Sequence, residues 1–264
     1  MSGDPADRSK YRVGVLREDG GRGGSQLLHR IFTEGRKLFI SKPINHFPLH
    51  ADAAHHILMG GGIGITPMIA MAHELHAAGS SFEMHYSCSS RNTAGYLGNL
   101  QSVAWNSNVQ MYFSDEGSRA NLNKVLSNYQ PGQHVYTCGP DRYMQSVHDA
   151  ANACGFPEDS IHSEYFSVPE TPEYINYPFT LKLVKSGKQF EIPTDKTATD
   201  VLIENGINID VKCSDGLCGV CKCGLVSGVA EHRDFVLSGK QRESGIILCQ
   251  SRAAENNGVL EIDL

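Results

Sequence analysis

The sequence lacks any long apolar run, and no stretch reaches the roughly 18 consecutive apolar residues that a membrane helix needs. Its first residues, Met1-Ser-Gly-Asp-Pro-Ala-Asp7, contain neither the apolar core nor the cleavage site of a signal peptide. Basic runs are also missing, and the formal net charge is −6, which argues against a nucleic-acid partner. We therefore expect a cytoplasmic protein that binds neither membranes nor nucleic acids.

Internal repeats and low-complexity tracts are missing as well. The chain has 264 residues, of which 40% are hydrophobic and 20% charged, as is typical of a globular protein with two or three small domains. Eight cysteines without a secretion signal indicate a reducing compartment, where thiols remain free to bind metals.

Four of these cysteines have a C-x4-C-x2-C spacing with a distant fourth member, which is the plant-type ferredoxin pattern for a 2Fe-2S cluster. They are Cys213, Cys218, Cys221 and Cys249. Gly216 and Gly219 let the loop turn sharply and bring backbone amides close to sulfur. Disulfides need an oxidising compartment, and structural zinc prefers two short ligand pairs. The spacing therefore predicts four iron ligands, and we interpret Cys223 as a bystander.

Near the amino terminus, alternation of apolar and polar residues predicts a strand over Tyr11–Glu18, and Leu38–Ile40 is consistent with another. Between them, the glycine-rich stretch Asp19–Ser25 leads into a predicted helix over Gln26–Phe32. Glycines that run into a serine at a helix start suit an anion site. A glycine-rich hairpin loop that is capped by serine explains this stretch equally well.

From His55 onward, short apolar strands alternate with helical segments, which predicts a doubly wound parallel sheet. The strands are 57–59, 82–86, 109–113, 134–138 and 161–163, and the clearest helices are 68–78 and 142–153. A nucleotide would lie at the carboxyl ends of the strands. Its pyrophosphate would lie over the turn Gly60–Gly64 and the helix that opens at Pro67.

The Rossmann fingerprint itself is absent, since these glycines do not match G-x-G-x-x-G and no acidic residue closes the second strand. The segment Ser87–Arg91 stands there instead, so a different dinucleotide geometry is needed. Cys138-Gly139-Pro140 follows a late strand. Its thiol suits a place beside a nicotinamide ring, but a buried strand residue before a turn would give the same pattern.

The proline-rich segment 169–178 has the composition of a linker. Beyond it, a predicted hairpin, one crossing helix and further short strands indicate a small mixed sheet of the β-grasp type, with the cysteine loop at its rim. The hairpin strands are 179–185 and 188–192, the helix is 197–205, a helical piece covers 235–243, and the later strands are 222–226 and 259–264.

Taken together, these motifs resemble the phthalate dioxygenase reductase and vanillate O-demethylase reductase family over nearly the whole chain. The resemblance rests on the segments Arg22-Gly-Gly-Ser25 with His29, Asn45–Leu49, Gly60–Pro67, Cys138–Pro140, Ser163–Phe166 and the four cysteines. The resemblance implies a flavin barrel represented by 1–50, an NAD domain at 51–168 and a ferredoxin domain at 179–264.

The resemblance also implies roles for single residues. Gly24 and Ser25 resemble an FMN phosphate contact, Cys138 the residue beside the nicotinamide, and Phe166 an aromatic that lies against the flavin. The expected pyrophosphate site consists of Gly61, Gly62, Gly64, Thr66 and Pro67, with Gly139 and Pro140 on the facing loop. NADH is expected over NADPH, although Arg91 could meet a 2′-phosphate.

One family feature is missing. The R-x-Y-S segment that holds the flavin would stand just before the stretch that resembles Ser2–Arg8, and R-x-Y-S occurs nowhere in the sequence. We therefore expect about half of a flavin barrel. After purification, FMN should be held in less than equimolar amount and NADH-driven electron flow should be small, with the iron–sulfur domain still folded.

The implied function is electron transfer from NADH through FMN to the cluster and on to a separate Rieske-type oxygenase or O-demethylase, because NADH delivers two electrons and the cluster accepts one. The chain has no C-x-H pair of a Rieske centre. Two alternatives stay open at this stage. One is a reductase for a cytochrome P450 or another monooxygenase, and the other is a flavin-less electron carrier.

Overall fold

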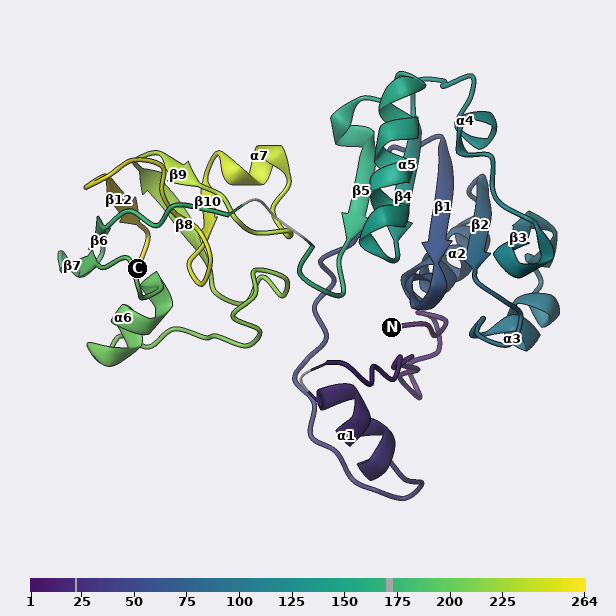
Figure 1. Cartoon of the computed structure of the whole chain (residues 1–264), viewed down its shortest axis with the longest axis horizontal. Helices are drawn as coiled ribbons and strands as arrows, with labels where there is room; N and C mark the ends of the chain where they lie inside the picture. Colours follow the sequence, from purple (N-terminus) through teal and green to yellow (C-terminus); the bar gives the residue numbers. More distant parts are fainter. Residues whose placement is uncertain (22, 170–172) are drawn as a thin grey trace. The chain divides into compact units, whose positions relative to one another are not determined.

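The computed structural model describes residues 1–21, 23–169 and 173–264, and these form two compact units, Met1–Glu164 and Tyr165–Leu264 (Figure 1). Each unit has its own sheet and its own hydrophobic core. Within the described residues, no helix is long and apolar enough to cross a membrane. The domain boundary expected at residue 50 stays a prediction. Residues 170–172 of the expected linker lie outside the described residues, and so does Arg22.

The first unit is built on a five-stranded sheet in the order β3-β2-β1-β4-β5. Its strands are β1 (His55–Gly61), β2 (Phe82–Cys88), β3 (Val109–Phe113), β4 (Gln133–Cys138) and β5 (Ile161–Glu164). All four strand pairs are parallel. The chain moves outward from β1 to β3 and then returns to place β4 on the other side of β1. The predicted doubly wound sheet is therefore confirmed, with its point of reversal between β1 and β4.

Helices cover both faces of this sheet (Figure 1). They are α2 (Ile65–Ala78), α3 (Leu97–Ser102), α4 (Leu122–Val125) and α5 (Asp141–Ala153), with short 3-10 turns η1 (Gly62–Gly64), η2 (Asn106–Asn108), η3 (Ser114–Glu116) and η4 (Glu158–Ser160). Successive strand residues face opposite sides. Leu58 and Tyr136 join the core under α2, whereas Ile57 and Val135 join the core under α5. The strands are apolar on both faces because both are covered.

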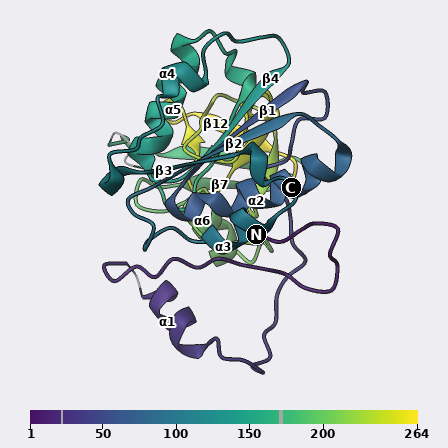
Figure 2. The same cartoon turned by 90° about the vertical axis from the view of Figure 1, so that its right-hand side faces the viewer.

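Residues 1–50 differ from the strands predicted for them. Among the described residues of this stretch, the only regular element is the helix α1 (Gly24–Ile31), which lies apart from the sheet (Figure 2). The strands predicted over Tyr11–Glu18 and Leu38–Ile40 are wrong, because neither segment forms a strand ladder with any other described part of the chain. Val13 and Ile40 are instead more than 60% exposed. The predicted helix is confirmed and starts two residues earlier.

The second unit is built on a mixed sheet in the order β10-β8-β12-β6-β7. Its elements are β6 (Phe179–Leu183), β7 (Gln189–Ile192), α6 (Ala198–Glu204), β8 (Lys222–Ser227), β9 (Ala230–Glu231), α7 (Gly239–Arg242), β10 (Gly245–Ile247), β11 (Arg252–Ala253) and β12 (Val259–Ile262). Strand β12 runs parallel to β6, and the other pairs are antiparallel. One helix against such a sheet confirms the predicted β-grasp arrangement, although the helical piece predicted over 235–243 shortens to α7.

Candidate nucleotide and iron–sulfur sites

The glycine turn after β1 touches the loop after β4, at the point where the strand order reverses. A Cβ added to Gly64 would lie 2.1 Å from the carbonyl oxygen of Cys138, and one added to Gly139 would lie 2.9 Å from the Cα of Gly61. Real Cβ atoms do not approach other atoms so closely. The two loops therefore meet backbone to backbone, and only glycine fits at these positions.

This edge of the sheet has features that suit an anion site. Helix α2 starts directly after η1, with Thr66 and Pro67 in its first turn, so the positive end of its dipole lies at the glycine turn. Gly62 has a left-handed φ of 54° and nothing within 4 Å of an added Cβ, so its backbone is open. The Thr66 hydroxyl donates to the carbonyl of Ile63 at 3.0 Å and holds the turn. The arrangement suits a pyrophosphate at the reversal point.

Cys138 ends β4 beneath this turn. Its side chain is 1% exposed, and burial raises the pKa of its thiol, with a further increase from Glu164 on the adjacent strand. Burial also raises the pKa of the Glu164 carboxyl group. The Cys138 thiol is thus neutral and polarisable, which suits a contact beside a ring better than it suits a nucleophile. Pro140, two residues later, caps α5.

The residues expected to hold FMN are placed differently. Ser25 lies in the first turn of α1, where its hydroxyl accepts a hydrogen bond from the Glu18 amide at 3.0 Å. An added Cβ on Gly24 would meet nothing within 4 Å. Because α1 lies apart from the sheet, these two residues are not brought to the glycine turn (Figure 2). Phe166 belongs to the second unit, where its side chain is 51% exposed.

In the second unit, three of the four predicted iron ligands share one loop. Gly216 and Gly219 in this loop have left-handed φ angles of 73° and 67°. A Cβ on Gly216 would come within 3.2 Å of the Cα of Asp234, so the loop folds tightly against that segment. The amide of Asp215 donates to the Cys213 sulfur at 3.3 Å. The sharp turn predicted from the glycines is present.

The four thiols form two contacting pairs. Contact with Cys249 lowers the pKa of Cys221 to about 6 and raises that of Cys249. Burial favours the neutral form of Cys213, but backbone amides and the Cys218 thiol together lower its pKa. A binuclear cluster takes two thiolates at each iron, so two pairs fit its ligand set. Across the described ranges no group of three side chains is already arranged for a single metal ion.

Cys223 lies elsewhere. It belongs to the main core of the second unit, and its thiol contacts the Asp263 carbonyl at 3.6 Å. Cys221 and Cys249 instead share a smaller cluster with Leu237 and Ile247.

Three supporting residues were not found from the sequence. Gln250 donates from its side-chain amide to the Ser214 carbonyl at 2.7 Å and braces the cysteine loop. The buried Asp234 accepts from the Leu237 amide at 2.9 Å. In the first unit, Glu116 pairs with Arg91. Short sequence patterns do not identify Gln250 or Glu116, because their partners Ser214 and Arg91 lie elsewhere in the chain. They do not identify Asp234 either, because it binds a backbone amide.

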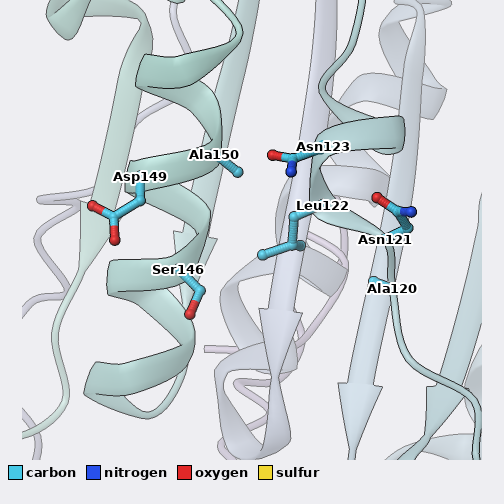
Figure 3. A pocket seen from close by; sticks show the side chains of 7 residues that line it. All are labelled: Ala120, Asn121, Leu122, Asn123, Ser146, Asp149 and Ala150. Atoms are coloured by element: carbon cyan, nitrogen blue, oxygen red, sulfur yellow. The ribbon is translucent and has the colours of Figure 1, made fainter.

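A surface depression lies between α4 and α5 (Figure 3). Its lining consists of Ala120, Asn121, Leu122, Asn123, Ser146, Asp149 and Ala150. Asp149 is its one charged group and accepts a hydrogen bond from Gln145 at 2.9 Å. The depression offers no cationic group to a phosphate and lies on the helical flank of the sheet. The glycine turn is therefore the better nucleotide site.

The chain is similar to known proteins over nearly its whole length. Residues 38–161 match the N-terminal domain of dimethylamine monooxygenase subunit DmmA-like proteins, and residues 182–254 match the 2Fe-2S iron-sulfur cluster binding domain. Phthalate dioxygenase reductase of Burkholderia cepacia is 36% identical over 99% of this chain and 82% of its own length. Vanillate O-demethylase oxidoreductase of Acinetobacter baylyi is 33% identical over 98% of this chain and 81% of its own length.

Two solved structures are also similar. The structure of phthalate dioxygenase reductase, described as a modular structure for electron transfer from pyridine nucleotides to [2Fe-2S], matches with a TM-score of 0.61 and 37% identity over 95% of this chain and 78% of its own. An intact type IV self-sufficient cytochrome P450 monooxygenase matches with a TM-score of 0.90 and 34% identity, over 100% of this chain and 34% of its own.

Proposed function

This chain belongs to the phthalate dioxygenase reductase family of oxygenase reductases, and we propose that it passes electrons from NADH through FMN to a 2Fe-2S cluster and on to a separate oxygenase. One observation carries the proposal. A backbone cradle at the reversal point of a parallel sheet and a set of four thiols occur in the same polypeptide.

Gly61, Gly62 and Gly64 would hold the pyrophosphate together with the amino end of α2, because the backbone is open at Gly62 and the positive end of the α2 dipole lies beside it. Gly139 and Pro140 would form the facing wall. Cys138 would lie beside the nicotinamide, where its neutral thiol adds polarisable contact without a charge. Gly24 and Ser25 would contact the FMN phosphate, and Phe166 would lie against the flavin.

Cys213, Cys218, Cys221 and Cys249 would hold the cluster. When bound, NADH supplies a hydride, FMN splits the electron pair, and the cluster carries single electrons. The amide of Asp215, 3.3 Å from the Cys213 sulfur, would stabilise the added negative charge and raise the reduction potential. In this account the protein fixes positions and potentials and performs no acid–base step.

The class of oxygenase forms a separate part of the proposal. We propose a Rieske-type partner in the cytoplasm, because phthalate dioxygenase reductase is similar over nearly the whole chain. The similarity to a self-sufficient P450 supports a P450 as the second candidate. Mixing the reduced chain with a purified Rieske oxygenase or with a P450, and following reduction of each metal centre, separates the two.

The activity is tested by steady-state NADH oxidation with FMN in the buffer. With ferricyanide as acceptor we expect turnover by the natural chain and by Cys221→Ser, because ferricyanide can take electrons before the cluster. With the oxygenase as acceptor only the natural chain should turn over. If the natural chain oxidises no NADH with either acceptor, the proposed function is wrong.

A further inference from the structure

The carboxyl ends of β2 and β3 are joined by an ion pair. Arg91 donates from Nε to Glu116 Oε1 at 2.6 Å and from Nη2 to Oε2 at 3.2 Å, which is a two-pronged contact. The guanidinium carbon lies 4.4 Å from the centroid of the Phe113 ring. Beside it, the Asp115 amide donates to the Ser89 carbonyl at 3.0 Å. The Arg91 side chain is thus held in one place although both partners are about half exposed.

This place matters for a dinucleotide. In doubly wound sheets, the adenosine ribose lies beyond the second strand, where an acidic residue accepts a hydrogen bond from the 2′-hydroxyl or an arginine meets a 2′-phosphate. In this chain no acidic residue closes β2. The carboxylate comes from η3, which follows β3, and it occupies the arginine that a 2′-phosphate would need.

The local charge points the same way. Arg91 lies beside the carboxylates of Glu116 and Asp115, and the hydrogen bond with Glu116 raises the pKa of Arg91. A 2′-phosphate would meet the Glu116 carboxylate and would have to break a two-pronged contact. A 2′-hydroxyl would only add a hydrogen bond to the carboxylate.

We propose that Glu116 recognises the adenosine ribose. Its carboxylate accepts a hydrogen bond from the 2′-hydroxyl and holds Arg91 away from a 2′-phosphate, so that the site selects NADH over NADPH. The inference rests on the proposed nucleotide site. The determinant of cofactor choice would thus lie outside the glycine turn and outside the second strand.

The test is a cycle of variants: Glu116→Gln, Arg91→Ala and the double variant. Glu158→Gln is the matched control, because it removes one exposed carboxylate at the amino end of β5. Binding of ADP and of 2′,5′-ADP is measured by calorimetry on the full chain, and NADH and NADPH turnover with ferricyanide and FMN is measured in parallel.

We expect Glu116→Gln to strengthen 2′,5′-ADP binding by about tenfold, as removal of one unit charge near a surface phosphate allows. ADP binding should weaken by less than threefold, and Glu158→Gln should change neither ligand. Arg91→Ala should remove the gain in the double variant, and alone it should not weaken 2′,5′-ADP binding.

Two results overturn the inference. If ADP binds but Glu116→Gln leaves the preference between the two ligands within twofold of the natural chain, Glu116 does not read the ribose. If Arg91→Ala alone weakens 2′,5′-ADP binding tenfold, the arginine is already available to a phosphate. Failure of ADP and NADH to bind in every variant would instead refute the nucleotide site itself, and the inference with it.

Discussion

The glycine turn of the first unit and the cysteine loop of the second prepare their ligand sites by opposite means. At the turn, Gly64 and Gly139 lack side chains because two backbones touch there. At the loop, side chains provide the ligands, and Gly216 and Gly219 only let the backbone bend around them. A nucleotide site of this kind is broken by adding one carbon atom, whereas a cluster site is broken by removing one sulfur atom.

The largest effect is expected at the cysteine loop. Replacing Cys221 by serine should abolish the cluster, because the alkoxide that would replace the thiolate is a much poorer ligand for iron at neutral pH. Iron content, visible absorption and the EPR signal of the reduced protein measure this. Cys223→Ser is the matched control and should keep the cluster, since its thiol lies in the core against the Asp263 carbonyl. The ligand assignment fails if the control loses its iron and Cys221→Ser keeps it.

The glycine turn should respond to the opposite change. Gly64→Ala places a methyl group on the Cys138 carbonyl, and overpacking against backbone costs about 3 kcal/mol or more of the free energy of unfolding of the first unit. Urea unfolding followed by Trp105 fluorescence measures it, because the single tryptophan lies buried in this unit. Gly98→Ala in α3 is the control, since its Cβ meets nothing within 4 Å. Equal unfolding midpoints for both variants would refute the backbone contact.

Acidification should destabilise the first unit more than the second, and this effect should be smaller than the two above. Burial, followed by nearby histidines, lowers the pKa of His56 and of His162 to about 4. The rings of His134 and His162 share a hydrogen bond at 2.9 Å, and burial also lowers the pKa of His134. His50 and Asp159 are further titratable groups near this pair. In the second unit, His232 is the single histidine.

A lowered histidine pKa means that the unfolded chain binds protons first as the pH falls. The neutral His56 side chain therefore stabilises the first unit fully above pH 6.5. As the pH falls from about 6.5 to 4, the free energy of unfolding decreases by about 3 kcal/mol on account of this residue, which is 3% exposed. Trp105 fluorescence should report unfolding of the first unit before far-UV changes of an isolated 165–264 fragment. His56→Gln should flatten this pH dependence. A first unit that keeps constant stability from pH 7 to 4.5 would contradict the prediction.

The sequence predicted those parts of the fold that depend on local pattern. The buried strands of the parallel sheet are apolar on both faces, so β1 to β5 were found to within a few residues. Alternation over Tyr11–Glu18 gives the faces of a strand but no partner, and the strand does not form. The glycine turn was found, but the reason for Gly64 was not, since its contact with Cys138 joins distant parts of the chain.

The sites show the same division. The cysteine spacing identifies the ligand set because three members share one short loop. Arg91 was recognised at the end of the second strand, whereas its partner Glu116 follows the next strand and becomes visible only in the folded sheet. The expected low FMN content and the roles of Ser25 and Phe166 stay predictions.

In the proposed function, one polypeptide carries electrons from NADH to its own cluster. An anaerobic titration of the full chain with NADH, with FMN in excess, tests this directly when the EPR signal of the reduced cluster is followed. We predict that NADH produces a cluster signal as large as the one that dithionite produces. The Gly64→Ala variant, treated in the same way, should give little or no signal with NADH. A cluster that dithionite reduces but NADH with FMN leaves oxidised would contradict the account.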